Sequence, residues 1–185
     1  MYISDIFPDR PAVGTREEAE ERSYALLEGL NIPFSRVDHD VAATMEDLIP
    51  VEEALGCGIC KNLFLTNRQQ TEFYLLLLPG SKPFKTKYLS KQLGTARLSF
   101  GSGEQLEEKL GVTSGSASVL ALAADPDNKV HLVIDKDILA AEFFACHPCR
   151  NSTTLKLATA DLKNILLPAL GHEAHWVELP WELEE

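Results

Sequence analysis

The sequence predicts an α/β domain of the α+β type, with helices packed on a mixed, mostly antiparallel sheet. Short apolar runs that suit strands alternate irregularly with amphipathic stretches that suit helices. Several of the expected strands are separated by polar turns, as in hairpins. Neither observation fits the regular strand–helix alternation of a doubly wound parallel sheet. With 45% hydrophobic and 24% charged residues, the composition is that of an ordinary globular protein.

The length is typical of a single domain. We expect residues 1–185 to form it, because a domain has about 150 residues on average. Folding should bury roughly 70% of the surface of the unfolded chain. The longest apolar run, residues 75–78, is far shorter than the roughly 18 residues of a membrane helix. Residues 1–10 lack an apolar stretch, and four cysteines occur without an export signal, so we expect a cytoplasmic protein.

The N-terminal third reads as helix, strand and helix. Thr15 and Glu18 form a Thr-x-x-Glu pattern, which predicts a capped helix that continues to about residue 28. Alternating apolar and polar residues over 34–38 predict a half-buried strand. Thr44 and Asp47 predict the start of a second helix, which should end at about residue 55 because a glycine follows.

The rest of the chain is richer in strands. The same patterns predict helices over residues 86–93, 104–110 and 160–170. They predict strands over residues 62–66, 73–78, 97–100, 118–122, 130–134, 142–145, 154–156 and 175–179. We expect residues 118–122 and 130–134 to pair with each other around the polar turn between them.

The charge distribution is uneven. The formal net charge is −11, which argues against non-specific binding to polyanions such as DNA. Residues 73–103, however, contain no Asp or Glu. Five cations occur there: Lys82, Lys85, Lys87, Lys91 and Arg97. Such a stretch predicts a local phosphate-binding face, although lysines on the outer side of a solvated helix would give the same pattern.

Two Cys-x-x-Cys pairs are the most conspicuous simple motif. Cys57 with Cys60, and Cys146 with Cys149, could together supply the four thiolates of a structural zinc site. The 85 residues between the pairs far exceed the usual spacing of about 15–20 in a compact zinc module. Redox chemistry would need a pair at a helix N-terminus, whereas Cys57 and Cys60 lie between a predicted helix and a strand. We therefore expect buried thiols and no metal, with the four cysteines as the alternative ligand set.

Three further features offer polar groups to a ligand. Lys61 precedes an apolar strand and could hold a phosphate or polarise a carbonyl, although a surface lysine is the simpler interpretation. The loop with His147 and Asn151 offers donors and acceptors without negative charge, or it is an ordinary turn. The loop with Gly115 and Ser116 could bring backbone N–H groups close to a ligand carbonyl, or it too is only a turn.

Four short blocks occur in a specific order along the chain. They are Lys61-Asn-Leu-Phe-Leu65, Leu98-Ser-Phe100, Gly111-Val-Thr-Ser-Gly-Ser116 and His147-Pro-x-x-Asn-Ser-Thr-Thr154. Together they resemble the YbaK/prolyl-tRNA-editing family, and within it the free-standing ProXp-ala/PrdX-type branch. The resemblance extends from about Thr15 to Val177. It implies the editing-domain fold of proteins associated with prolyl-tRNA synthetase, and it implies a deacylase that acts in trans.

The resemblance also implies a substrate and a set of site residues. Members of this branch hydrolyse the ester of alanine mischarged on proline tRNA, using the 2′-hydroxyl of the substrate and a water in place of a protein nucleophile, so we expect no cofactor. Lys61 matches the essential lysine of the family, which we take as the catalytic residue. The residues expected to bind substrate are Gly115, Ser116, His147, Asn151 and Thr44. Val37, Val41 and Thr44 lie where the family lines its amino-acid pocket.

Other interpretations remain open at this point. The same scaffold could deacylate tRNA mischarged with cysteine, serine or threonine, the cysteine pairs could form a zinc or thiol module, or the chain could bind tRNA without cleaving it. The expected partners are the acceptor end of proline tRNA and, as a further candidate, prolyl-tRNA synthetase; we expect neither DNA nor a membrane. Ser114 stands where the family usually has proline.

Overall fold

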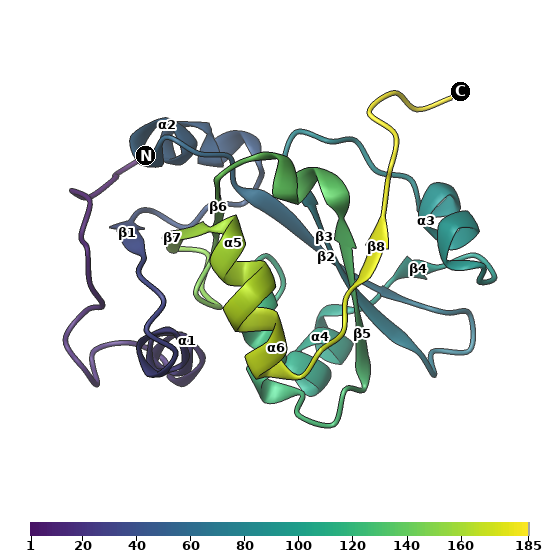
Figure 1. The fold of residues 1–185 in the computed structure, drawn as a ribbon, viewed down its shortest axis with the longest axis horizontal. Coiled ribbons are helices and arrows are strands. Elements are labelled where there is room, and N and C mark those ends of the chain that lie inside the picture. Colours follow the sequence, from purple (N-terminus) through teal and green to yellow (C-terminus); the bar gives the residue numbers. More distant parts are fainter. Residues whose placement is uncertain (185) are drawn as a thin grey trace.

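The computed structural model describes residues 1–184, and two sheets form its framework (Figure 1). The smaller sheet has the order β1–β7–β6 and is antiparallel throughout. The larger sheet has the order β4–β2–β3–β5–β8 and is mixed, because β3, β5 and β8 run parallel to one another. The predicted class, a mixed and mostly antiparallel α+β fold, is therefore confirmed.

The strands have the following bounds. In the smaller sheet they are β1 (Ser35–Asp38), β6 (Phe143–Cys146) and β7 (Thr153–Ala158). In the larger sheet they are β2 (Cys60–Thr66), β3 (Phe73–Pro79), β4 (Ser99–Phe100), β5 (Val130–Asp135) and β8 (His175–Val177).

The longer helices are α1 (Glu18–Gly29), α2 (Ile49–Leu55), α3 (Thr86–Leu93) and α4 (Gly103–Leu110). Short helical turns are η1 (Glu46–Leu48), η2 (Val119–Ala124) and η3 (Lys136–Ala140). The last predicted helix is present as three consecutive pieces, α5 (Thr159–Asp161), a π-helical turn η4 (Leu162–Leu166) and α6 (Leu167–Leu170). In Figure 1, α1 lies beside β1 at one end of the molecule and α3 beside β4 at the other. No helix within residues 1–184 has the length and apolarity needed to cross a membrane.

The larger sheet buries both of its faces, as the unbroken apolar run in β3 requires. Leu75 and Leu77 pack in the main core, which also takes up residues of α1, α4 and η2. Leu76 and Leu78 point to the opposite face and pack against Leu89 of α3. A third cluster joins α2 to the smaller sheet.

Several sequence-based predictions are wrong in detail. Residues 118–122 do not form a strand, because the Ser118 hydroxyl accepts a hydrogen bond from the Leu120 amide at 3.2 Å and starts the helical turn η2. Strand β5 consequently pairs in parallel with β3 instead. Thr15 does not cap α1, since its hydroxyl donates to the Ala12 carbonyl. Only Ser99–Phe100 of the predicted strand 97–100 forms β4, which leaves most of one edge of β2 open.

Candidate active site

A cavity of about 290 Å³ lies where the start of β2 meets two loops. Its walls come from the loop before α2, from β2, from the loop after α4 and from the end of β6. Four of the predicted catalytic and substrate-binding residues line it: Lys61, Gly115, His147 and Thr44. The other lining residues are Ala42, Ala43, Met45, Leu48, Cys60, Asn62, Leu63 and Ala117. The cavity thus combines a few polar groups with mostly apolar walls, as small-molecule sites do.

Lys61 lines this cavity at the start of β2. Its position follows from the short β4, which pairs only with Leu65 and Thr66 and so leaves the Lys61 end of β2 uncovered. The Lys61 ammonium donates to the backbone carbonyl of Lys82. Partial burial lowers the pKa of Lys61. Because a neutral carbonyl holds the amine, its positive charge stays available to a phosphate or a carbonyl oxygen of a ligand.

His147 is buried and held in one tautomer. Its Nδ1 lies 2.8 Å from the Thr153 carbonyl oxygen, which can only accept, so we assign the proton to Nδ1 and leave Nε2 as an acceptor. The Thr154 hydroxyl lies 3.3 Å from the same Nδ1 and 2.8 Å from Nε2 of His39. Burial lowers the pKa of His147 to about 4, so the ring is neutral at physiological pH.

Asn151 and Ser116 are not among the residues that line the cavity, but they connect segments that do. The Asn151 amide side chain donates to the Ala42 carbonyl at 3.2 Å, and its backbone N–H donates to the Ser116 hydroxyl at 3.2 Å. Gly115 has a φ of +85°, and a Cβ there would lie 3.3 Å from the Asn151 Nδ2. Asn151 therefore connects the loop of Ala42 with the loop of Ser116 through hydrogen bonds. Of Gly115, Ser116 and Asn151, only Gly115 is among the residues that line the cavity.

Two apolar residues that line the cavity were not predicted from the sequence. Met45 and Leu48 line it, whereas Val37 is buried in the cluster beneath α2 and Val41 is exposed. The loop is shaped by Asp47, whose carboxylate accepts from the Thr44 amide at 2.9 Å while its own amide donates to the Thr44 hydroxyl. The i, i+3 spacing of Met45 and Leu48 after the predicted cap at Thr44 was the available signal, since it puts both on one helical face.

The cysteines are buried or half-buried thiols in the described structure. Burial raises the pKa of Cys60 to about 12 and that of Cys149 to about 11. The pKa values of Cys57 and Cys146 are raised for the same reason. Within residues 1–184 no group of three or more His, Cys, Asp or Glu side chains is arranged to hold a metal ion. Cys60 lines the cavity, but a thiol with so high a pKa is a poor nucleophile at neutral pH.

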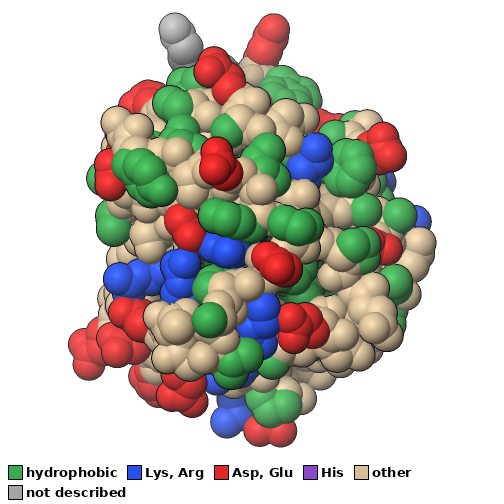
Figure 2. Space-filling model, turned by 90° about the vertical axis from the view of Figure 1, so that its left-hand side faces the viewer, with side chains coloured by type: hydrophobic (Ala, Val, Ile, Leu, Met, Phe, Trp, Pro, Cys, Tyr) green, Lys and Arg blue, Asp and Glu red, His purple; other side chains and the backbone are tan. Residues whose placement is uncertain are grey.

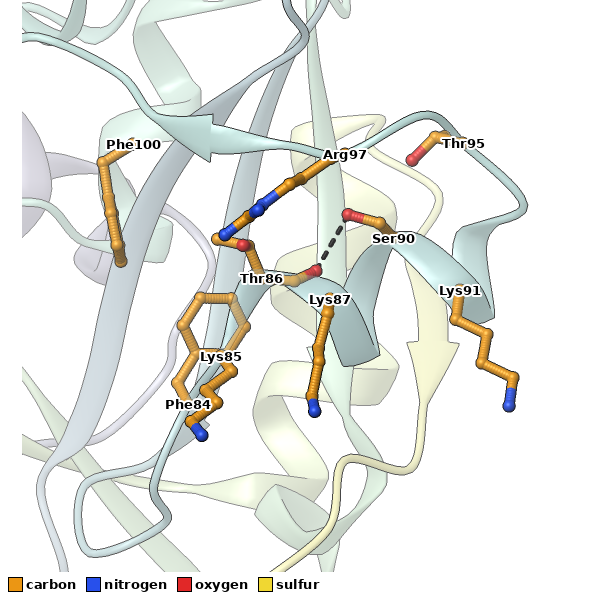
Figure 3. A pocket seen from close by; sticks show the side chains of 9 residues that line it. All are labelled: Phe84, Lys85, Thr86, Lys87, Ser90, Lys91, Thr95, Arg97 and Phe100. Atoms are coloured by element: carbon orange, nitrogen blue, oxygen red, sulfur yellow. Dashed lines mark hydrogen bonds between the residues drawn. The ribbon is translucent and has the colours of Figure 1, made fainter. Parts of the chain in front are cut away.

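A second hollow, of about 540 Å³, lies between α3 and β4 (Figure 3). Its lining includes two aromatic rings, Phe84 and Phe100, whose centroids are 6.1 Å apart in an edge-to-face arrangement. Four exposed cations also line it: Lys85, Lys87, Lys91 and Arg97. We call this hollow the basic groove. Lys82, the fifth cation of the acid-free stretch, does not belong to it, because its side chain is buried among carboxylates.

The opposite end of the molecule has a different electrostatic character. On the face that carries the N-terminal segment, α1 and β1, basic side chains lie among acidic ones (Figure 2). Arg16 and Arg36 both pair with Asp38, at 2.9 and 2.7 Å, and Arg150 pairs with Glu17. The basic groove, by contrast, has no carboxylate among its lining residues in the described part of the chain.

The buried histidine makes stability depend on pH. The unfolded chain binds a proton at His147 with a pKa near 6.5, whereas the folded protein does so only near pH 4. The unfolded state therefore holds more protons between these values, and stability falls as the pH falls from about 6.5 to 4. We expect a loss of about 3 kcal/mol in the free energy of unfolding at pH 4 relative to pH 7 from this residue. The pKa of His39 is also lowered by burial, so it adds to the loss.

Urea unfolding followed by circular dichroism between pH 4 and pH 8 measures this dependence. His147→Gln keeps hydrogen-bonding capacity without the titration, so its stability should change less over the same range. The matched control is His175→Gln, because His175 is exposed. A wild-type curve as flat as that of His147→Gln would contradict the assignment of a neutral, buried ring.

The chain is similar to known proteins over most of its length. Residues 39–165 match the family model described as "Aminoacyl-tRNA editing domain", which covers more than half of the chain. The chain is 30% identical over 162 residues to the prolyl-tRNA editing protein ProX of Acetoanaerobium sticklandii, an alignment that covers 88% of this chain and 98% of the relative. It is 32% identical over 156 residues to the prolyl-tRNA synthetase associated domain-containing protein 1 of Danio rerio, with 83% and 82% covered.

A solved structure described as that of a candidate trans-editing enzyme for prolyl tRNA synthetase has the same fold. Its TM-score is 0.63 at 16% sequence identity, and the alignment covers 90% of this chain and all of that one. At this identity the likeness concerns the fold alone. The family match includes Lys61, Gly115 and His147, which the structure brings together around one cavity. The chain belongs to the aminoacyl-tRNA editing domain family and is an aminoacyl-tRNA deacylase.

Proposed function

We propose that the chain is a trans-editing hydrolase that deacylates mischarged proline tRNA, with alanyl-tRNA(Pro) as its substrate. The observation that carries the proposal is the shared cavity of Lys61, Gly115 and His147, bounded by Met45 and Leu48. The names of the relatives, which refer to prolyl-tRNA editing and to prolyl-tRNA synthetase, support the choice of tRNA.

The chemistry at the cavity supports attack by water. The Cys60 thiol is protonated because its pKa is about 12, and His147 with a pKa of about 4 is far too weak a base to match neutral pH. His147 therefore suits orientation: its Nε2 can accept a hydrogen bond from an amino or hydroxyl group. The aminoacyl ester is already activated, so holding it beside a water and the 2′-hydroxyl of the terminal ribose supplies a large part of the rate.

Lys61 and the Gly115 loop supply the polar contacts in this proposal. The Lys61 ammonium holds the terminal phosphate or stabilises the negative charge that develops on the ester oxygen. Gly115, with its positive φ and no side chain, lets the substrate carbonyl approach the backbone of the loop. An oxyanion donor in such a position contributes about 3–4 kcal/mol to catalysis.

Size supports alanine as the residue removed. Alanine and proline differ by only a few carbon atoms, and one methylene is worth only about 1–3 kcal/mol in a binding pocket. Discrimination must therefore come from exclusion of the larger ring. Met45 and Leu48 line the cavity and can narrow it. The Met45 side chain packs closely against Gly80, because a Cβ at Gly80 would lie 2.6 Å from the Met45 Cε.

The basic groove is suited to the RNA itself. Leu63 lines the cavity, and two residues further along β2 Leu65 lies opposite Phe100 of the groove. Two residues of a strand span about 7 Å, so one nucleic-acid end can reach both hollows. Cations that track a backbone, with aromatic rings on which bases stack, are the usual elements of single-strand binding. We therefore propose that the acceptor end of the tRNA lies along the basic groove and enters the cavity.

A panel of mischarged tRNAs tests the catalytic proposal. We expect fastest deacylation of alanyl-tRNA(Pro), slower cleavage of cysteinyl-, seryl- and threonyl-tRNA, and none of prolyl-tRNA(Pro). Lys61→Ala should lower the rate by at least about 100-fold, as removal of one positioned polar group does. The exposed Lys129 supplies the control Lys129→Ala, which should retain wild-type activity. Wild-type turnover by a folded Lys61→Ala protein would show that Lys61 has no part in catalysis. Cleavage of prolyl-tRNA(Pro) as fast as that of alanyl-tRNA(Pro) would refute discrimination by size.

Binding of uncharged proline tRNA at different salt concentrations tests the groove. Arg97→Ala and Lys87→Ala should each weaken binding and reduce the slope of log K against log[salt] by about 0.7–0.9, the value for one lost phosphate contact. Phe100→Ala should weaken binding by about 1–3 kcal/mol, with the slope unchanged, because stacking is lost. Fluorescence anisotropy gives both quantities, with Lys129→Ala again as the control. Slopes identical in all these proteins would exclude the groove as an RNA contact.

A further inference from the structure

Lys82 is a wholly buried lysine with a complete set of partners. It follows β3, and its ammonium lies 2.9 Å from Asp135 Oδ2, 2.6 Å from Asp137 Oδ2 and 2.8 Å from the Leu179 carbonyl oxygen. The Trp181 ring covers the same ammonium at 4.7 Å. Three N–H donors thus meet three acceptors, which is the condition under which a buried charge is tolerated.

The main chain of the same residue contacts Lys61, a residue that lines the cavity. The Lys82 carbonyl accepts the hydrogen bond from the Lys61 ammonium. One residue therefore links the catalytic lysine to the end of β5, where Asp135 lies, and to the C-terminal segment, where Leu179 lies. Asp135 is itself fully buried and also accepts from the Leu179 amide at 3.1 Å, so its carboxylate cannot move without disturbing that segment.

The turn that presents this carbonyl is tightly enclosed. The Lys82 amide donates to the Pro79 carbonyl at 3.0 Å and closes the turn of residues 79–82. Gly80 in its middle has no room for a side chain, since a Cβ would come within 2.2 Å of the Ile59 carbonyl oxygen. The turn thus touches the start of β2 and, through Met45, the wall of the cavity. Its position fixes where the carbonyl can hold the Lys61 amine.

We propose that Lys82 and Asp135 are positioning residues for deacylation, because their buried ion pair fixes the turn of residues 79–82 whose carbonyl directs the Lys61 amine into the cavity. The inference rests on the proposed role of Lys61. Without the pair the turn is free to shift, and Lys61, a long side chain with many rotamers, swings out of the cavity toward solvent. A displacement of about 1 Å at such a site costs up to about 100-fold in rate.

The test removes the two buried charges together, because removal of one alone would leave an unpaired charge in the interior and unfold the protein. The second carboxylate partner of Lys82, Asp137, has a side chain that is 42% exposed, so its charge stays solvated in the variant. In Lys82→Met/Asp135→Asn the volumes are kept and neither charge remains. Single-turnover deacylation of alanyl-tRNA(Pro) gives the rate. Trace labelling of amines with acetic anhydride over a range of pH, read by mass spectrometry, gives the pKa of Lys61 without any substrate.

In the wild-type protein the pKa of Lys61 is lowered by burial, and we expect the labelling to place it below that of the exposed Lys129. In the double variant we expect the Lys61 pKa to rise toward its ordinary value and the single-turnover rate to fall by about 10- to 100-fold, with tRNA affinity nearly unchanged. The control for lost stability is Leu166→Ala, in the main core on η4. It should lower the melting temperature without changing the rate or the Lys61 pKa.

A folded double variant with the wild-type rate and an unmoved Lys61 pKa overturns the proposal. If the double variant does not fold, Gly80→Ala takes its place, since it keeps the ion pair and displaces the turn by steric contact. A Cβ at Gly80 would also contact Met45 in the cavity wall, so the deciding quantity for this variant is the Lys61 pKa and not the rate. We expect that pKa to rise, and an unmoved Lys61 pKa is equally decisive against the proposal. Should the wild-type protein cleave no mischarged tRNA at all, the proposed function fails, while the Lys61 pKa still reports whether Lys82 and Asp135 position the amine.

Discussion

Strand β2 has a neighbouring strand on both sides only near its end, where Leu65 and Thr66 lie opposite Phe100 and Ser99 of the two-residue strand β4. The site depends on this short pairing. A longer β4 would cover the beginning of β2 and close the space that Lys61, Asn62 and Leu63 now border. An uncovered strand edge is usually a liability in a folded protein. Here the loop before α2 and the loop after α4 flank it and turn the edge into a cavity.

The charges of the molecule are unevenly distributed, which suits the proposed contact with RNA despite a net charge of −11. At the end of the molecule around α1 and β1, arginines are neutralised by nearby carboxylates such as Asp38. At the other end, the groove beside α3 presents lysines and an arginine together with two phenylalanine rings. Between these ends, Lys61 is held by a neutral backbone carbonyl. The acidic remainder of the surface repels RNA elsewhere, which favours binding in a single orientation.

Sequence patterns were informative wherever local signals and burial agree. The helix over residues 86–93 and the strand starting at Phe73 are where the patterns predicted them. The patterns failed at residues 118–122, where one serine hydroxyl starts a helical turn in an apolar run that otherwise suits a strand. They also could not show that Lys82 faces inward, since its partners Asp135 and Leu179 lie 53 and 97 residues away. Within the site, the order of the motifs predicted Lys61, Gly115 and His147. The spacing of Met45 and Leu48 puts both on one helical face, but only the folded loop shows that this face borders the cavity.

We propose that one cavity at the open edge of β2 receives the aminoacyl end of a tRNA. The most direct measurement is a crystal structure with a non-hydrolysable analogue in which an amide joins alanine to the 3′ position of adenosine. We expect the alanyl group to lie between Gly115 and Met45, with the Lys61 ammonium within hydrogen-bonding distance of the analogue. An analogue seated in the separate hollow bordered by Pro79, Ile138 and Phe143 would contradict it.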